Sequence, residues 1–414
     1  MSTCVVVGSG GREHALAWAL SRSAQVTVTP GNAGIAAHGI TCLDRPATSL
    51  EADLFVIGPE QPLVDGVADD LRAQGKVVVG PGRDGARLEG SKAYMKEFLD
   101  AAGVPTARYG TFSDVEEATR YLHTMSPPYV IKTDGLAAGK GVLVTNDLEE
   151  ASNDVRDKLS GATFGPAGTT VVIEEGLDGP ECSLTVLCDG VHVLALAPAQ
   201  DFKRVGDGDR GANTGGMGAY APMRSLSGAQ VDEVLSCIVE PTLAQLCARA
   251  IDFRGVLYAG LMLTSQGPKL LEYNVRFGDP ETEVLAPLYG DGLFDLLLSV
   301  GRGELSPAPV PVTGNAVTVV LASHGYPASS RHGDVIAGLG DDGQLAEPIE
   351  GVVIFHSGSA RDERGRFLTA GGRVLAVTGV AATMSEARRR AYQGASLVTF
   401  EGKVTRSDIA RAAS

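Results

Sequence analysis

The chain has 414 residues, 44% of them apolar, and a formal net charge of −15. At ~100–200 residues per domain, this length predicts about two to four globular domains. The acidic balance gives the chain no electrostatic reason to bind nucleic acid or an anionic membrane, so any phosphate site must be a local basic patch.

The positions of the cysteines, the histidines and the apolar runs indicate which kind of protein this is. None of the six cysteines falls in a C-x-x-C motif, so we expect buried free thiols. The seven histidines show no metal-type spacing. The valine run at 5–7 is too short for a signal peptide, and no apolar run approaches ~18 residues. We therefore expect a cytoplasmic protein that does not span a membrane.

The first part of the chain alternates short apolar strands with helices. This alternation predicts a doubly wound parallel sheet, whose ligands bind at the carboxyl edge of its strands. The strands are expected at 4–7, 26–29, 53–57 and 76–79, and the helices at 12–20, 64–74 and 88–102, with Ser91 as a cap.

A glycine loop follows the first strand. Gly10 and Gly11 open a helix there and could present backbone N–H groups to a phosphate ester, although a tight strand-to-helix turn explains the loop almost as well. A nicotinamide cofactor is disfavoured, because Glu13 replaces the last glycine of the dinucleotide fingerprint. Asn32 and Glu60 follow later strands, and their side chains suit the hydroxyls of a sugar.

A second glycine-rich loop joins two strands expected at 129–132 and 142–145. The first strand ends on Lys132, and the loop carries Lys140. It is not a Walker A loop, because Gly141 follows Lys140 where that motif has Ser or Thr. We expect an antiparallel pair whose loop closes over phosphates as a lid, with both lysines in one cleft.

A strand expected at 169–173 is followed by a turning segment. Its backbone groups could bind the edge of a purine covered by Leu177, and Glu181 could hold ribose hydroxyls; an ordinary connector is the alternative. A hairpin with an Asp-Gly turn is expected next. Lys203 and Arg204 then form a local anion clamp, and a glycine-rich segment follows.

The most informative stretch is the second strand of a later hairpin. Because strand side chains alternate, Glu272, Asn274 and Arg276 project to the same side. Their carboxylate and amide oxygens suit Mg²⁺, and the guanidinium suits phosphate or carboxylate; a solvated strand end is the alternative. Asp279 and Glu281 follow just past the strand. The hairpin is expected at 255–264 and 269–274, after a largely helical segment at 225–251.

A proline-rich linker at 307–311 precedes the last part of the chain. Three arginines, 388–390, lie in its helix and are expected to form a solvated face. Strands are expected at 316–322, 352–355 and 373–378, and the helix at 385–393.

Ten motifs in order carry a resemblance that covers almost the whole chain. They read GSGGREHA at 8–15, PGNAG at 30–34, GPEQPLV at 58–64, LEGSK at 88–92, IKTDGLAAGKGV at 131–142, QDFKRVGDGD at 200–209, NTGGMGAY at 213–220, LYAGLM at 257–262, EYNVRFGDPE at 272–281 and GGRVLAVT at 371–378. In these motifs the chain resembles the phosphoribosylamine–glycine ligases, or glycinamide ribonucleotide synthetases, of the ATP-grasp superfamily.

The resemblance implies an activity and a fold. The family joins glycine to 5-phosphoribosylamine with ATP through a glycyl phosphate, in the second step of purine biosynthesis. The fold would be α/β, with a doubly wound N-terminal domain at 1–103, a two-lobed ATP-grasp domain at 104–306 and a mixed α/β domain at 307–414. The mobile lid would span about 122–192. Only small-molecule partners are implied, and we expect a monomer.

The resemblance also implies roles for single residues. Arg276, Lys203 and Lys140 would be catalytic, and Glu272 and Asn274 would hold Mg²⁺ or Mn²⁺. The residues facing ATP would be Lys92, Lys132, Gly139, Lys140, Gly141, Glu174, Glu175, Leu177 and Glu181. The residues facing the other substrates would be Gly10, Gly11, Asn32, Glu60, Asp201, Asn213, Thr214, Gly215, Gly216, Met217, Gly218, Arg276 and Asp279.

At two points the residue roles known for the family do not carry over directly to this chain. The strand at 258–264 lacks the acidic metal ligand that many ATP-grasp proteins place there, so a second metal would need Asp279 or Glu281. No general base is obvious. The alternatives are an ATP-grasp ligase for another acid or amine, a non-catalytic nucleotide-binding protein, and a dehydrogenase.

Overall fold

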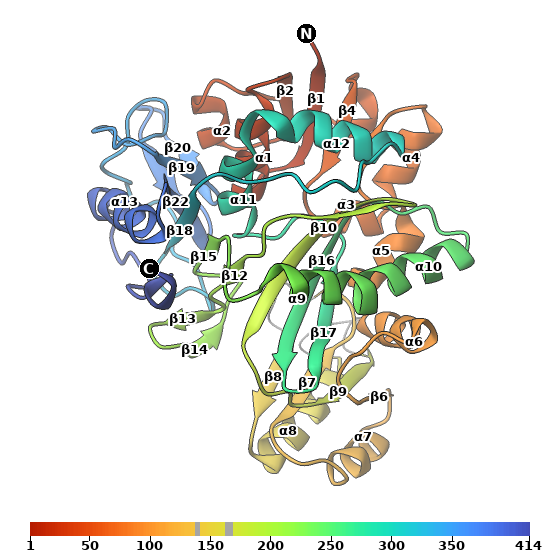
Figure 1. The fold of residues 1–414 in the computed structure, drawn as a ribbon. Helices are drawn as coiled ribbons and strands as arrows, with labels where there is room; N and C mark the ends of the chain where they lie inside the picture. The colour runs from red at the N-terminus through yellow and green to blue at the C-terminus, as the bar shows by residue number, and fades with distance from the viewer. Residues whose placement is uncertain (137–140, 162–168) are drawn as a thin grey trace.

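The computed structural model describes residues 1–136, 141–161 and 169–414 (Figure 1). The N-terminal part is the expected parallel sheet, with strand order β3-β2-β1-β4-β5 and every pair parallel. Its strands are β1 (Thr3–Gly8), β2 (Gln25–Pro30), β3 (Thr41–Cys42), β4 (Leu54–Ile57) and β5 (Val78–Val79). Its helices are α1 (Gly11–Leu20), α2 (Ala33–Ala37), α3 (Glu60–Val64), α4 (Val67–Ala73), α5 (Arg83–Gly90) and α6 (Lys92–Ala102).

Two of the expected helices are each divided in the structure. The helix expected at 64–74 is interrupted at Gly66, whose φ of +89° favours glycine and turns the chain between α3 and α4. The helix expected at 88–102 is interrupted at Ser91. The side chain of Ser91 accepts a hydrogen bond from the N–H of Tyr94. Ser91 is therefore an N-cap, as expected, but it caps only α6.

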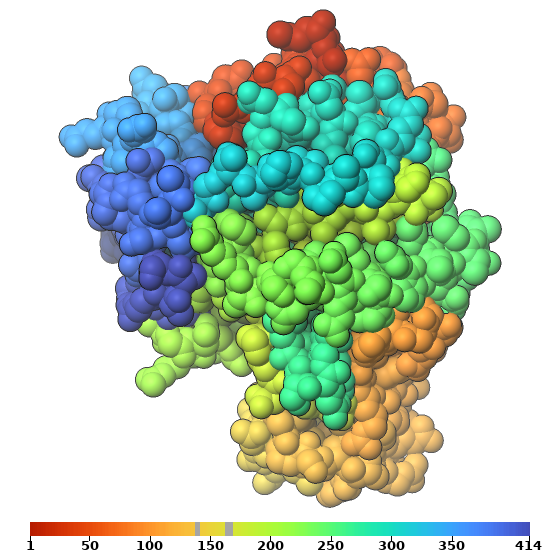
Figure 2. All heavy atoms as spheres, viewed as in Figure 1, coloured from red at the N-terminus to blue at the C-terminus, as the bar shows by residue number. Residues whose placement is uncertain are grey.

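A four-stranded antiparallel sheet with order β6-β9-β7-β8 and two helices lies in the region where the lid was expected. We call these elements, which run from Tyr109 to Glu175, the lid lobe. It has its own small core, separate from the rest, and Figure 2 shows it projecting from the body of the molecule. Its elements are β6 (Tyr109–Phe112), α7 (Val115–Leu122), β7 (Tyr129–Thr133), β8 (Val142–Thr145), α8 (Leu148–Leu159) and β9 (Val171–Glu175).

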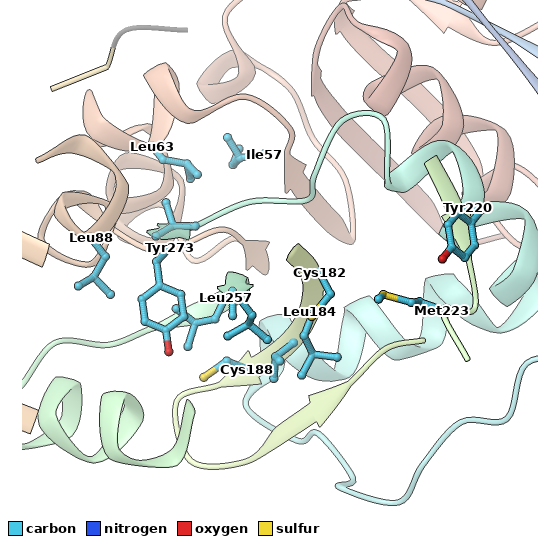
Figure 3. Close-up of a cluster of buried hydrophobic side chains, with 14 of the residues drawn as sticks. Ile57, Leu63, Leu88, Cys182, Leu184, Cys188, Tyr220, Met223, Leu257 and Tyr273 are labelled. Carbon is cyan, nitrogen blue, oxygen red and sulfur yellow. The ribbon is translucent and has the colours of Figure 1, made fainter. Parts of the chain in front are cut away.

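A second antiparallel sheet, with order β11-β10-β16-β17, lies between the lid lobe and the N-terminal sheet (Figure 1). Both of its expected hairpins are confirmed. Figure 3 shows Leu257 and Tyr273 of this sheet in the same buried cluster as Ile57 and Leu63 of the N-terminal part. Its elements are β10 (Glu181–Asp189), β11 (Val193–Ala195), α9 (Gly228–Val234), α10 (Glu240–Ala248), β16 (Arg254–Thr264) and β17 (Gly267–Asn274).

The last sheet is built from two distant parts of the chain. Its order is β12-β15-β18-β22-β19, and all its pairs are antiparallel. β12 (Gln200–Asp201) and β15 (Gly218–Ala221) precede the proline-rich linker, whereas β18 (Asn315–Ala322), β19 (Val352–His356) and β22 (Arg373–Ala381) follow it. Two short hairpins complete the strands, namely β13 (Arg204–Gly206) with β14 (Arg210–Asn213), and β20 (Ser359–Arg361) with β21 (Phe367–Thr369).

The final helix, α13 (Met384–Leu397), corrects one expectation. Only Arg389 of its arginine run is exposed, where it pairs with Glu386. Arg388 donates to the carbonyl of Ile409, and Arg390 donates to the carbonyl of Val380. Two of the three arginines therefore tie the helix to neighbouring backbone carbonyls through their long side chains.

The stretch Thr282–Arg302 bears on the expectation that no apolar run approaches ~18 residues. It comprises α11 (Thr282–Tyr289), a short turn and α12 (Leu293–Arg302). By length and composition its 21 residues would suffice to cross a membrane: their most apolar 18-residue window has a mean hydropathy of 1.3, and about 50% of that window is buried inside the protein. Its apolar side chains pack with α1 in the core, as expected for a buried helix pair. All six cysteines are free thiols, as expected, but only Cys4, Cys182 and Cys188 are buried, whereas Cys247 is exposed.

Candidate functional site

The expected row of side chains begins on β17 and ends just past it: Glu272 and Asn274 belong to the strand, whereas Arg276 lies two residues beyond its end. Nη2 of Arg276 lies 3.3 Å from Oδ1 of Asn274, which places both side chains on one face. Tyr273 points the other way, and its hydroxyl bonds to Thr242 in the core. Alternation along the strand therefore separates a polar face from a packed face, and β17 is held by the packed one.

Glu272 is surrounded by cationic side chains from several elements. Burial raises the pKa of its carboxyl, but Lys203, Lys132, Lys92 and Arg276 outweigh burial and lower the pKa overall. The carboxylate is therefore ionised at neutral pH. One anionic oxygen ligand, an amide oxygen and several cations meet at this face of β17, which is the composition of a site for a metal and phosphates.

Arg276 connects this face to the N-terminal part of the chain. Its Nη2 lies 2.9 Å from Oε1 of Glu89, and its Nε lies 3.3 Å from Oε2 of Glu60. Burial opposes ionisation of Glu60, yet Arg276 and Arg12 lower its pKa overall. Glu60, expected near a sugar, is thus a partner of Arg276. Glu89 was missed by sequence reasoning, because only the folded chain brings it to Arg276.

Glu174 does not lie in the turning segment where it was expected. It belongs to β9 and is 1% exposed, and its carboxylate lies 2.9 Å from Nζ of Lys132 and 3.2 Å from Nζ of Lys96. Lys132 also donates to the carbonyl of Leu271, next to Glu272. The strand continues two residues beyond the expected end, and the side chain of Glu174 points into the protein.

Lys96 was also missed, although the sequence held a signal for it. With Lys92, Met95 and Leu99 it forms the i, i+3, i+4, i+7 stripe of a helix. A lysine on such a stripe needs an anionic partner once it is buried, and in the structure that partner is Glu174.

In the segment after β9, several backbone donors have no partner in the described part of the chain. The N–H of Glu175 donates to Arg108, and the N–H of Gly176 donates to Pro128. The N–H of Leu177 has no partner among the residues that the structure describes. The carboxylate of Glu175 accepts from the N–H of Arg108, so its side chain is used locally.

The glycine loop of the lid is only partly described. Gly139 and Lys140 lie outside the described residues. Gly141 accepts from the N–H of Thr133, which closes the base of the loop between β7 and β8. Lys92 donates to the carbonyl of Gly135 at 3.2 Å, so the start of α6 and the start of the loop lie together.

A second group of charges surrounds Lys203, beyond the end of β12. Asp201 raises the pKa of Lys203, and burial, which opposes that rise, is the smaller effect. Glu181 Oε2 lies 3.5 Å from Lys203 Nζ. Burial and Asp201 raise the pKa of Glu281 to about 7, and Tyr258 donates to Glu281 at 2.7 Å. Lys203 therefore stands in a cluster of acids.

The first glycine loop is occupied by a side chain of the protein itself. The N–H of Gly10 donates to Oε2 of Glu13 at 2.6 Å, and Oε1 of Glu13 lies 2.5 Å from Nε of Arg12. A Cβ at Gly8 or Gly58 would lie within 2.6 Å of Glu13 atoms. The carboxylate thus fills the space at the start of α1 where a phosphate was expected, because an anion is favourable there.

Asn32 has no free hydrogen-bonding position in this conformation. Its Oδ1 accepts from the N–H groups of Gly34 and Ile35, both at 2.9 Å. Its Nδ2 donates to the carbonyls of Ser9 and His356. The amide offers two donors and two strong acceptor positions, so all are used within the protein. This geometry favours a structural role for Asn32.

The segment 213–218 packs against the turn that follows β17. A Cβ at Gly216 would lie 2.4 Å from Cδ of Pro280, so only glycine fits there. The hydroxyl of Thr214 donates to the carbonyl of Lys203. Met217 is fully buried and Gly218 begins β15, whereas Asn213 ends β14 opposite Arg204.

Two arginines near this turn were missed by sequence reasoning. Arg373 lies 3.0 Å from Oδ1 of Asp279 and brings the C-terminal part of the chain to the site. Burial opposes ionisation of Asp279, but Arg373 and Arg12 lower its pKa overall. Arg12 also donates to the carbonyl of Phe277. Nothing near Arg12 or Arg373 in the sequence indicates that they meet.

The donor set is small for a metal site. In the part of the chain that the structure describes, no group of three or more His, Cys, Asp or Glu side chains could hold a metal ion. The ionised Glu272 and the amide oxygen of Asn274 remain as oxygen donors on one face. Asp279 and Glu281, suggested for a second metal, are engaged by Arg373 and Tyr258.

Comparisons with known proteins give one answer over the whole chain. Models of the phosphoribosylglycinamide synthetase N domain, ATP-grasp (A) domain and C domain match residues 2–89, 90–282 and 316–412. A phosphoribosylamine–glycine ligase of Brucella melitensis is 44% identical, over 98% of this chain and 96% of the relative. One from Leifsonia xyli subsp. xyli is 46% identical, over 98% and 99%.

Solved structures agree. The crystal structure of a phosphoribosylamine–glycine ligase from Thermotoga maritima matches with a TM-score of 0.84 and 39% identity, over 98% of this chain and 100% of that one. A biotin carboxylase domain from Hydrogenobacter thermophilus, in complex with MgADP and bicarbonate, matches with a TM-score of 0.74 and 17% identity, over 98% and 91%. At that identity the second likeness shows the fold alone.

Proposed function

This chain belongs to the phosphoribosylglycinamide synthetase family, and from that premise we propose how its side chains carry out the family's reaction. The chain is an ATP-dependent ligase that forms a carbon–nitrogen bond between glycine and 5-phosphoribosylamine in purine biosynthesis. A carboxylate oxygen of glycine attacks the γ-phosphorus, which releases ADP and forms glycyl phosphate. The amine then attacks the carbonyl carbon, and phosphate leaves as the nitrogen loses a proton.

We place the phosphates of ATP between the lid lobe and β17. Lys92 and Lys132 would bind them, because Lys92 donates to the carbonyl of Gly135 at the start of the lid loop and Lys132 donates to the carbonyl of Leu271 beside Glu272. Lys140 would reach the same phosphates, with Gly139 and Gly141 allowing close approach of the loop. The adenine edge would accept from the N–H of Leu177, beside the backbone of Glu174 and Glu175. Glu181 would hold the ribose.

The donor set on β17 fits a hard divalent cation, Mg²⁺ or Mn²⁺. Glu272 is ionised, and the amide oxygen of Asn274 faces the same side, so these two residues would hold the ion. When bound, the ion would neutralise charge on the phosphates. Around it, Arg276 and Lys203 would stabilise the charge that develops on the acyl phosphate and during attack by the amine.

The sugar phosphate and glycine would lie beyond the end of β17, beside the turn that follows it. Asp279, Gly11 and the segment from Asn213 to Gly218 border this region, and Arg12 and Arg373 supply positive charge beside Asp279. Asp201, Gly10, Asn32 and Glu60 were expected to contact substrate here. Gly10 and Asn32 already make hydrogen bonds within the protein. The backbone groups of the residues that follow them are therefore better candidates for contacting substrate.

The convergence of Lys203, Lys132, Lys92 and Arg276 on the ionised Glu272 is the observation that carries these roles. The test of the reaction mixes ATP, Mg²⁺, glycine and freshly made phosphoribosylamine and follows ADP. We expect ADP release only when every component is present. Release with glycine or the amine omitted, or none with all present, would count against the ligase.

We further propose that the enzyme acts as a monomer in the cytoplasm on small molecules alone. The six free thiols support a reducing compartment. We propose domains at 1–103, 104–306 and 307–414, with a mobile lid at about 122–192. Light scattering during gel filtration measures the mass of the particle, which should match 42.8 kDa.

A further inference from the structure

Two buried lysines share a single carboxylate at the root of the lid lobe. Lys96 of α6 has a side chain that is 0% exposed, and its Nζ lies 3.2 Å from Oε2 of Glu174. Nζ of Lys132 lies 2.9 Å from the other oxygen, Oε1. The roles proposed above use Lys132 and leave Lys96 unassigned.

The same cluster joins three parts of the molecule. Lys96 donates to the hydroxyl of Thr106 at 2.6 Å, and that hydroxyl donates to the carbonyl of Leu270 on β17 at 2.7 Å. Lys132 donates to the carbonyl of Leu271, the residue before Glu272. Glu174 belongs to the lid sheet, so α6, the lid sheet and β17 meet at one carboxylate.

Among the described residues, Glu174 is the only carboxylate within ion-pair distance of either ammonium group. The ring of Tyr109, 5.5 Å from Nζ of Lys96, adds a cation–π contact. Asp100, bound to the hydroxyl of Tyr109, and Glu272, on the side of Lys132, act on the two lysines from farther away. Burial, together with Lys132, lowers the pKa of Lys96 to about 8, against the pull of Glu174. One carboxylate shared by two buried ammonium groups leaves little negative charge close to them, and an arriving anion would add to it.

We propose that Lys96 is a positioning residue for ATP: it fixes Glu174, and Glu174 in turn holds Lys132 where the phosphates bind. Lys132, the member of the cluster beside Glu272, then presents the positive charge that a bound polyphosphate would meet. This inference rests on the ATP site placed above between the lid lobe and β17.

Lys96→Met keeps the length and apolar stem of the side chain and removes its charge. The matched control is Lys158→Met, since Lys158 is a buried lysine of α8 in the same lobe that pairs with Asp154. Binding of a non-hydrolysable MgATP analogue, measured by calorimetry, should weaken at least tenfold for Lys96→Met and less than twofold for Lys158→Met. The KM for glycine should change less than twofold in both.

A double variant distinguishes positioning from an independent contact. If Lys96 acts through Glu174, then Lys96→Met combined with Glu174→Gln should bind the analogue no more weakly than Glu174→Gln alone. Multiplied effects would overturn the proposal. So would analogue binding within twofold of the parent for a folded Lys96→Met.

If Lys96→Met does not fold, Thr106→Val provides a milder test. It keeps the volume of the side chain and removes the hydroxyl that joins Lys96 to β17. Analogue binding should weaken about threefold and recover in Thr106→Ser; no change in Thr106→Val would overturn the proposal. Because binding is measured without turnover, a parent that binds the analogue and yet forms no ADP would reject the ligase and leave this inference standing.

Discussion

The guanidinium of Arg276, two residues past the end of β17, lies 3.3 Å from the amide oxygen of Asn274, the last residue of that strand. The proposed metal ligand thus already accepts a hydrogen bond from a cation. Arg276 is itself oriented by Glu89 and Glu60. The face is therefore arranged for positive charge at the amide oxygen, and a divalent ion there would share that oxygen with Arg276.

Glu272→Gln should abolish turnover at ordinary Mg²⁺ while the protein stays folded. The amide keeps the shape of the side chain but removes the anionic ligand and the countercharge of four cationic groups. ADP release across a Mg²⁺ titration and circular dichroism provide the measurement. The control is Glu233→Gln, an exposed position on α9. Parental turnover in Glu272→Gln would remove this residue from the metal site.

Arg276→Lys should lower kcat/KM by about 100-fold, the usual effect of losing one preorganised donor. A lysine cannot contact Glu89, Glu60 and Asn274 together, because it lacks the planar fork of a guanidinium. The steady-state rate with each substrate varied in turn measures the effect. A variant with parental rates would show that positive charge alone suffices there.

Asn32 offers a test between a structural and a binding role. Asn32→Ala removes the cap of α2 and should lower the free energy of unfolding by about 1–2 kcal/mol, measured in urea. Asn32→Asp keeps the cap acceptor and loses the donors to Ser9 and His356, so it should lose less. A tenfold rise in the KM for phosphoribosylamine at parental stability would instead assign Asn32 to the substrate.

Stability should fall in mild acid because of His356. Its Nε2 faces the carbonyl of Gly343, which can only accept, so the neutral ring donates there and accepts from Ser359 at Nδ1. Burial lowers the pKa of His356 to about 4, below the ordinary 6.5. As pH falls through 6.5 the unfolded chain takes up a proton first, so stability is lost between about pH 6.5 and 4.

The size of that loss is about 1.4 kcal/mol per pH unit for one such group, and at most about 3 kcal/mol. Urea unfolding at pH 7 and pH 5 measures it in the parent and in His356→Asn, which should depend less on pH. His332→Asn, at an exposed position, should keep the parental dependence. Equal slopes in all three proteins would contradict a role for His356.

Local pattern was enough to predict β17 and the row on it. Side-chain alternation depends only on the strand itself, so the shared side of Glu272 and Asn274 follows directly from the sequence. Arg276 lies past the end of the strand, where alternation no longer decides its direction, and its contact with Asn274 needed the structure. The strand–helix alternation likewise predicts the parallel N-terminal sheet. The interruption at Gly66 is also local, yet a continuous apolar pattern concealed it.

What the sequence could not indicate depends on distant pairing. β9 reaches Glu175 because it is paired with β6 and β7 on both sides, and this turns Glu174 inward onto Lys132. The meeting of Arg373 with Asp279 depends on the packing of the last sheet against the turn after β17. Neither contact produces a periodic pattern or a residue spacing that could be recognised in the sequence.

The shared sheet limits how this chain can be divided. β15 pairs with β18 across the linker, with Gly218 opposite Val319 and Ala221 opposite Ala316. A fragment cut at residue 307 would keep β15 and leave its N–H and C=O groups exposed along one edge. Such a fragment would tend to self-associate, so permuted or split versions of the enzyme should be opened elsewhere.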